Sequence, residues 1–231
     1  MNRVGATAPG KALLCGEYAV LDGAPAVVAA VDRRVTAAWS PDTVSMPPEV
    51  EATLEFARGC CGDVTGTLTV DTKALGQESS KLGLGSSAAA AAATAGAVFA
   101  THGHALSDPR VVRRVFECAL EGHASIAPQG SGVDVAASTF GGFLGFRRGN
   151  SIDVDRLAPP PGLCIALVWT GHAARTSDLV AKVVALRAQT PGSYREHMTR
   201  LEEGALDFIE AFRRGSAEGV VRAAGSYGAV M

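Results

Sequence analysis

The segment Gly83-Leu84-Gly85-Ser86-Ser87, followed directly by six alanines, constrains the fold of this chain more than any other stretch. Its glycines allow a sharp turn and a close approach to a ligand, and alanine is the strongest helix former. The free N–H groups of a helix's first turn attract phosphate, aided by the helix dipole. The segment therefore predicts an anion-binding loop at the start of a buried helix. The alternative is a loop in which serine merely caps a small-residue core helix.

The composition describes a globular chain with no general attraction for polyanions. With 231 residues, of which 47% are hydrophobic, the chain can bury a sizeable core as one large domain or two small ones. Its formal net charge is −2 at pH 7, so neither nucleic acid nor an acidic membrane surface is expected as a partner. Phosphate binding must therefore be a local property.

Cysteine usage and the N-terminus favour a cytoplasmic protein. The cysteines are odd in number and have no C-x-x-C spacing; they are Cys15, Cys60, Cys61, Cys118 and Cys164. The first ten residues lack the apolar core of a secretory signal, and no stretch approaches the roughly 20 apolar residues that cross a bilayer. We therefore expect a reducing compartment and no membrane span.

Hydrophobic spacing and turn residues predict strands and helices throughout the chain. The expected strands are 4–8, 18–21, 26–31, 35–39, 65–71, 141–146 and 163–169. The expected helices are 49–58, 88–100, 110–121, 130–139, 177–187, 195–214 and 218–230. The loop at 155–162, with three consecutive prolines, is the best candidate linker. The mixture of strands and helices predicts an α+β chain, and the linker predicts domains at 1–155 and 156–231.

Three separated segments place single polar groups among small residues. They are Pro9-Gly10-Lys11 through Glu17, the Gly83–Ser87 loop, and Gly130-Ser131-Gly132-Val133-Asp134. Phosphoryl transfer needs held phosphates, an aligned attacking oxygen and positive charge, which these groups can supply. The loop is not a Walker A motif, because its serines follow the second glycine directly and Lys81 precedes it. The H-R-D and D-F-G companions of a protein-kinase loop are also missing from the sequence.

Taken together, the three segments resemble the motifs of the GHMP kinases, a family of small-molecule kinases. The resemblance covers roughly the first 150 residues, which is a typical domain length. Details that resemble the phosphomevalonate kinase branch include Gly16-Glu17-Tyr18-Ala19-Val20, Lys81-Leu82 before the loop, and Gly130–Ala136. The resemblance implies an ATP-dependent kinase that converts phosphomevalonate to diphosphomevalonate on the mevalonate route to isoprenoids, with ATP and Mg²⁺ as cofactors.

The resemblance also implies a two-domain architecture. A ribosomal-protein-like α+β domain comes first, and a ferredoxin-like α+β domain follows it. The family's third motif, a C-terminal glycine-rich loop, is not found after Arg195. We therefore expect the second domain to be incomplete, either as a fragment or as a shortened homologue that no longer catalyses.

Residues that match the family motifs acquire expected roles. Asp134 would take the proton from the attacking oxygen or orient it, and Lys11 would keep that carboxylate ionised and offset developing charge. The implied ATP-binding residues are Lys81, Gly83, Leu84, Gly85, Ser86, Ser87 and Ala88. The implied magnesium contacts are Ser87 and Glu121. The implied substrate-binding residues are Glu17, Tyr18, Lys81, His123, Ser131, Gly132 and Arg175.

Several alternatives stay open at the level of sequence. Asp134 could simply cap the helix that follows Gly132, and Glu121 could be an ordinary exposed helix residue. A phosphorylated acceptor requires a further basic group, for which Lys81, Arg175 and His123 are the candidates. Mevalonate kinase shares every catalytic role and differs in this pocket. A non-catalytic nucleotide-binding protein of the same fold is the alternative from another class.

Overall fold

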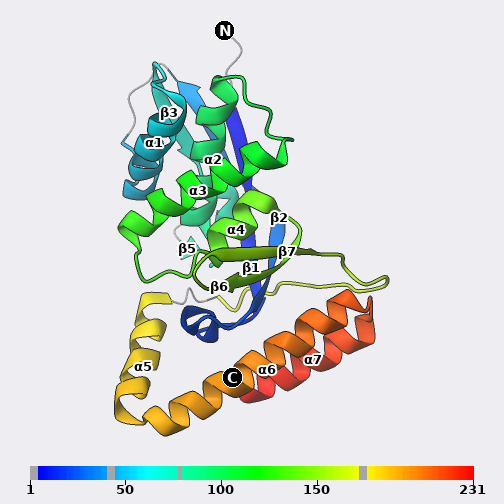
Figure 1. Cartoon of the computed structure of the whole chain (residues 1–231). Helices are drawn as coiled ribbons and strands as arrows, with labels where there is room; N and C mark the ends of the chain where they lie inside the picture. Colours follow the sequence, from blue (N-terminus) through cyan, green and yellow to red (C-terminus); the bar gives the residue numbers. More distant parts are fainter. Residues whose placement is uncertain (1–4, 41–44, 78–79, 172–175) are drawn as a thin grey trace. The chain divides into compact units, whose positions relative to one another are not determined.

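The computed structural model describes residues 5–40, 45–77, 80–171 and 176–231 of the chain (Figure 1). Two compact units are present. The first comprises Met1–Ala12 and Ala30–Gly141, and the second comprises Leu13–Ala29 and Gly142–Met231. These units divide the chain at different residues from the boundary at 155/156, which stays a prediction about folding domains. Arg175 lies outside the described residues.

The first unit is built on strands and a layer of helices. Its strands are parts of β1 (Gly5–Cys15) and β2 (Ala26–Ser40), with β3 (Thr67–Asp71), β4 (Gly76–Gln77) and β5 (Ser80–Lys81). Its helices are α1 (Pro48–Cys61), η2 (Lys73–Leu75), α2 (Ser86–Thr101), α3 (Pro109–Ile126) and α4 (Val133–Phe140). Strand β3 pairs antiparallel with the end of β2, with Thr36 opposite Asp71.

Helix α2 is the core element of the first unit because its side chains are small on every face. Residues 88–99 of this helix are all buried. Helices α1, α3 and α4 pack against it. Helix α3 begins where Asp108 accepts a hydrogen bond from the Arg110 N–H, with Pro109 in its first turn. The predicted helices at 49–58, 88–100 and 110–121 are thereby confirmed, within a few residues at their ends.

The second unit combines a β-hairpin with three long helices. Its elements are η1 (Ala19–Asp22), β6 (Phe143–Arg148), β7 (Ile152–Leu157), α5 (Thr176–Gln189), α6 (Pro191–Arg213) and α7 (Ala217–Val230). Strand β6 pairs antiparallel with the first residues of β2 and with β7. The core joins Val27, Leu157, Phe208, Phe212 and Tyr227. In the described ranges, no helix combines the length and apolarity needed to cross a membrane.

Several predicted strands were wrong in their limits or their type. Strand β1 runs straight through Pro9-Gly10, which is possible because β1 is an edge strand and proline's missing N–H costs no ladder bond there. The predicted strands 26–31 and 35–39 form one continuous strand, and 18–21 is mostly a 3₁₀ helix. Residues 163–169 form no strand, because no described strand pairs with them.

Candidate active site

The Gly83–Ser87 loop leads directly into the N-terminus of α2. Gly85 is the N-cap residue, with φ of 72°, and no side chain in the described part of the chain caps the helix. The first hydrogen bond of the helix joins the Ala89 N–H to the Gly85 carbonyl at 3.0 Å. The N–H groups of Ser86, Ser87 and Ala88 precede this bond and are the donors that a helix leaves for an anion. The interpretation in which serine merely caps this helix is therefore wrong.

Strand β1 holds the loop through its backbone. The Lys11 N–H donates to the Leu84 carbonyl at 2.8 Å. A Cβ on Gly10 would lie 2.7 Å from the same carbonyl oxygen, so only glycine permits this approach. A Cβ on Gly85 would lie 2.8 Å from Cγ of Lys11. Because neither glycine carries a side chain, the aliphatic part of the Lys11 side chain can pack against the first turn of α2. The sequence offered only the Pro-Gly-Lys string as a signal for this contact.

Lys11 and Asp134 form an ion pair. The Lys11 Nζ lies 3.1 Å from Oδ1 of Asp134, and the two side chains are 17% and 35% exposed. Asp134 is the second residue of α4, which follows Gly132 in the left-handed conformation with φ of 86°. An exposed ion pair contributes little, but partial burial reduces solvent screening here. The structure therefore brings together the two residues that are expected from the sequence to be catalytic.

A serine side chain within the loop before α4 stabilises that loop. The buried Ser131 hydroxyl accepts a hydrogen bond from the Val133 N–H at 3.3 Å. This contact stabilises the turn that carries Gly132 and directs the start of α4. Substrate binding by Ser131 and Gly132 stays a prediction, and the geometry gives both residues a part in positioning Asp134.

His123 lies against Ser87. Its Nε2 is 3.2 Å from the Ser87 hydroxyl oxygen. Glu121 precedes His123 by two residues on α3 and is exposed. Two residues correspond to about 200° around a helix, so these side chains leave α3 on opposite sides. The structure therefore brings His123 to the loop and does not bring Glu121 there, which weighs against Glu121 as a magnesium contact.

The other four predicted substrate residues lie in the second unit or have side chains outside the described structure. Glu17 and Tyr18 belong to the second unit. The Glu17 atom Oε2 is buried and has no hydrogen-bond partner within the described part of the chain. Tyr18 has φ of 62°, the only positive value among the described non-glycine residues. Lys81 lies in strand β5, and its side chain, like the whole of Arg175, falls outside what the structure describes.

The groups around the start of α2 are of the types that bind a nucleotide and its metal ion. Two positions that exclude a Cβ border the first turn of α2, which suits the close approach of a polyphosphate. Within the described residues, no group of three His, Cys, Asp or Glu side chains could hold a metal ion. Mg²⁺ usually takes only one or two protein carboxylates together with substrate phosphates. The Asp134 carboxylate and Ser87 hydroxyl are oxygen ligands of that kind.

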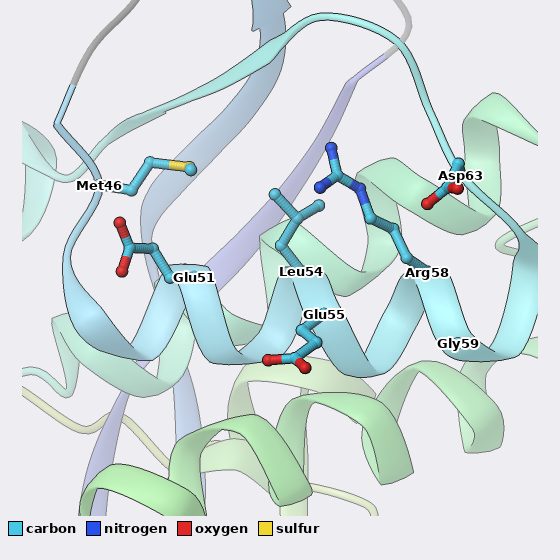
Figure 2. A pocket seen from close by; sticks show the side chains of 7 residues that line it. All are labelled: Met46, Glu51, Leu54, Glu55, Arg58, Gly59 and Asp63. Atoms are coloured by element: carbon cyan, nitrogen blue, oxygen red, sulfur yellow. The ribbon is translucent and has the colours of Figure 1, made fainter.

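A concave region lies along α1. Its volume is about 560 Å³, and Figure 2 shows the side chains that line it: Met46, Glu51, Leu54, Glu55, Arg58, Gly59 and Asp63. Three of them are carboxylates and one is a guanidinium, whose Nη2 donates to the Val64 carbonyl at 3.2 Å. None of the predicted site residues lines this region, so it takes no part in the candidate active site.

Comparison with known proteins matches this chain to the GHMP kinases, among them a phosphomevalonate kinase and a mevalonate kinase. The family model described as GHMP kinases N terminal domain matches residues 53–142. The chain is 30% identical over 241 residues to phosphomevalonate kinase of a Streptomyces species, covering 75% of this chain and 63% of that protein. It is 32% identical over 246 residues to mevalonate kinase of Thermococcus sibiricus, covering 90% and 71%.

A solved structure gives the same result for the fold. The structure of Streptococcus pneumoniae phosphomevalonate kinase in complex with phosphomevalonate and AMPPNP matches with a TM-score of 0.77 at 16% identity. The match covers 98% of this chain and 79% of that one. At this identity the likeness concerns the fold alone, which is the α+β two-domain architecture that the sequence predicted.

Proposed function

The chain belongs to the GHMP kinases, and from this premise we propose that it serves as an ATP-dependent kinase whose acceptor is phosphomevalonate. The observation that carries the proposal is the 3.1 Å contact between Lys11 and Asp134, next to the open N-terminus of α2. The chain spans about 63% of the length of its Streptomyces relative, so the activity of the whole protein is part of the proposal.

The loop and α2 would hold the phosphates of the nucleotide. The N–H groups of Ser86, Ser87 and Ala88 offer donors, and the helix dipole favours negative charge at that point. When bound, ATP supplies the phosphoryl group, with Mg²⁺ neutralising part of its charge. Ser87 and Asp134 are the residues we propose as oxygen contacts of the metal.

The role of Asp134 depends on the acceptor. The oxygen of a phosphate monoester is largely ionised at neutral pH, since its second pKa is about 6. Such an oxygen needs orientation and charge compensation, and no base. A hydroxyl acceptor keeps its proton, so a carboxylate within reach must accept that proton as the bond to phosphorus forms. Lys11 serves both cases, because its ammonium offsets the charge that collects beside Asp134.

The phosphate already carried by the acceptor requires a cation of its own. We propose Lys81 and Arg175 for this role, because the family resemblance implies both as substrate-binding residues and each can pair with phosphate. Glu17 and Tyr18 complete the proposed substrate set, supported by the positive φ of Tyr18 and by the buried Glu17 oxygen, which has no hydrogen-bond partner among the described residues. Unusual backbone conformations of this kind cluster at functional sites.

Mevalonate kinase is the second candidate, favoured by the 32% identity to the Thermococcus sibiricus protein. Measurement of ADP release with mevalonate and with phosphomevalonate, side by side, separates the two. The proposal expects turnover with phosphomevalonate. Turnover with mevalonate alone would overturn it in favour of the second candidate.

A non-catalytic role gives a different pattern. A chain that binds nucleotide only for regulation would bind ATP equally well as wild type and as Asp134→Ala, and would release no ADP with either acceptor. Calorimetric titration with a non-hydrolysable ATP analogue measures the first property. The same preparations, assayed for ADP, measure the second.

A further inference from the structure

Helices α1 and α3 of the first unit pack unusually closely. A Cβ placed on Gly122 of α3 would overlap the backbone and hydroxyl of Thr53 on α1, so the two helices meet there without an intervening side chain. Thr53 itself is buried, and its hydroxyl donates to the Glu49 carbonyl at 2.7 Å. This contact brings the rest of both helix faces within side-chain reach.

Two cysteines face one another further along the same helix pair. The Sγ atoms of Cys60, near the end of α1, and Cys118, in the middle of α3, lie 3.3 Å apart. Cys60 is exposed and Cys118 is buried. The Arg114 guanidinium donates to the Cys60 carbonyl at 3.1 Å, which ties the end of α1 to α3. The two sulfurs are thus held in contact by helix packing and by the hydrogen bond from the Arg114 side chain to the Cys60 carbonyl.

We propose that Cys60 and Cys118 are a modification site at which a peroxide forms a reversible disulfide that joins α1 to α3. A disulfide requires a sulfur separation of about 2.05 Å, so the sulfurs must close by roughly 1.3 Å from their reduced positions. Side-chain rotation and a small helix shift supply a movement of that size. This proposal does not depend on the proposed kinase activity.

The exposed thiol reacts first. The Cys60 thiolate attacks one peroxide oxygen, the O–O bond breaks, and the leaving hydroxide takes up a proton to become water. The resulting Cys60 sulfenic acid is attacked by the Cys118 sulfur, which gives up its proton as the second water leaves. Two thiols lose two electrons and one peroxide molecule gains them.

The surroundings of Cys118 keep it from reacting first. Burial, and to a lesser extent the contact with Cys60, raise the pKa of the Cys118 thiol to about 12. A thiol of this kind does not react with peroxide by itself at neutral pH. The sulfenic acid formed 3.3 Å away is the electrophile within its reach.

Cys61 provides a matched control. It follows Cys60 on α1 and is partly buried, and its side chain is turned by about 100° around the helix. The Cys118 sulfur contacts the sulfur of Cys60 at 3.3 Å. A disulfide that formed through mere proximity of any α1 cysteine would use Cys61 when Cys60 is absent.

The test treats the full chain with hydrogen peroxide, blocks free thiols with iodoacetamide, and maps tryptic peptides without reductant. Cys60 and Cys61 share peptide 59–73, and Cys118 lies in peptide 115–147. The proposal expects these peptides linked in wild type and Cys61→Ser, separate in Cys60→Ser, and separate again after dithiothreitol. The thermal midpoint of wild type and Cys61→Ser should rise on oxidation, and that of Cys60→Ser should not.

Two results would overturn the proposal. One is full alkylation of Cys60 and Cys118 in wild type after peroxide treatment, with no linked peptide. The other is an equally abundant link in Cys60→Ser, which would assign the reaction to Cys61. Because Cys60 and Cys61 lie at the end of α1, their serine variants should fold, and a melting curve of each reduced variant verifies this.

Discussion

The Ser87 hydroxyl oxygen lies 3.2 Å from Nε2 of His123, although the two residues are 36 positions apart in the chain. Ser87 stands in the first turn of α2, where we propose that nucleotide phosphates and magnesium bind. His123 reaches it from α3. From the sequence, His123 is one of three candidates for binding the substrate's phosphate, after Lys81 and Arg175. The geometry supports a different role, in which His123 fixes the direction of the Ser87 hydroxyl.

The first prediction separates these two roles. His123→Ala should raise the KM for MgATP by about two- to tenfold, the worth of one hydrogen bond, and leave the acceptor KM unchanged. Initial-rate kinetics with each substrate varied in turn measures both constants. His197→Ala, at an exposed position on α6, is the matched control and should change neither. An increase in the acceptor KM alone would instead support binding of the substrate's phosphate by His123.

The second prediction concerns the Lys11–Asp134 pair. With a hydroxyl acceptor, Asp134→Asn should lower kcat by about 10²- to 10⁴-fold, the usual contribution of a general base. With a phosphate acceptor the loss should be smaller, because the nucleophilic oxygen is already ionised. Lys11→Met should then be the more damaging change, by about 10²- to 10³-fold.

Rates with the two acceptors, measured for both variants, decide this point. Asp153→Asn, at an exposed position on β7, is the control and should leave the rate unchanged. If Asp134→Asn and Lys11→Met both keep wild-type rates, neither residue acts in the reaction. In the double variant the losses should not add, because the two groups act as a unit.

The third prediction compares two glycines of the loop. Gly85→Ala and Gly83→Ala both force an alanine into a positive φ, at 72° and 77°, which costs about 1–2 kcal/mol. Only the Cβ at position 85 meets Lys11, at 2.8 Å, whereas a Cβ at position 83 finds open space. Gly85→Ala should therefore lose more unfolding free energy, by about 1–3 kcal/mol.

Denaturant unfolding of the two variants measures the difference. Gly85→Ala should also lose more activity than Gly83→Ala, because Lys11 must move and its contact with Asp134 is disturbed. Equal losses of stability in the two variants would contradict the close approach of Lys11 to Gly85.

The fourth prediction concerns alkaline pH. Burial raises the pKa of the Cys15 thiol from 9.0 to about 12, with a smaller opposing contribution from its hydrogen bond with Val27. Between these values the folded chain keeps a proton that the unfolded chain releases. The free energy of unfolding must therefore fall as pH rises, by about 1.4 kcal/mol per pH unit for this group.

Unfolding measured at several values between pH 9 and pH 12 should show a shallower slope for Cys15→Ala than for wild type. Tyr194, whose pKa burial and its hydrogen bond to Asp22 raise to about 12, adds to the slope in both proteins. Cys164→Ala, at an exposed position, is the control and should keep the wild-type slope. An unchanged slope in Cys15→Ala would refute the assignment.

What the sequence determined by itself is local. The Gly83–Ser87 loop, the all-buried alanine helix after it and the capped start of α3 depend on neighbouring residues, so their residue types sufficed to predict them. The family was likewise predictable, because its motifs are contiguous strings. The strand prediction failed at residues 163–169, which have a strand composition but no described strand beside them to pair with.

The tertiary structure decided which distant side chains meet. The pairs Lys11–Asp134, Ser87–His123 and Cys60–Cys118 each join separate elements, and each depends on how far two elements approach and how they are rotated. The family resemblance predicted the first pair, and the spacing of residues in the sequence did not predict the other two. Helix rotation also separated His123 from Glu121, which the sequence alone could not do. Close packing, set by residues as small as Gly10 and Gly122, is the physical reason that these contacts exist.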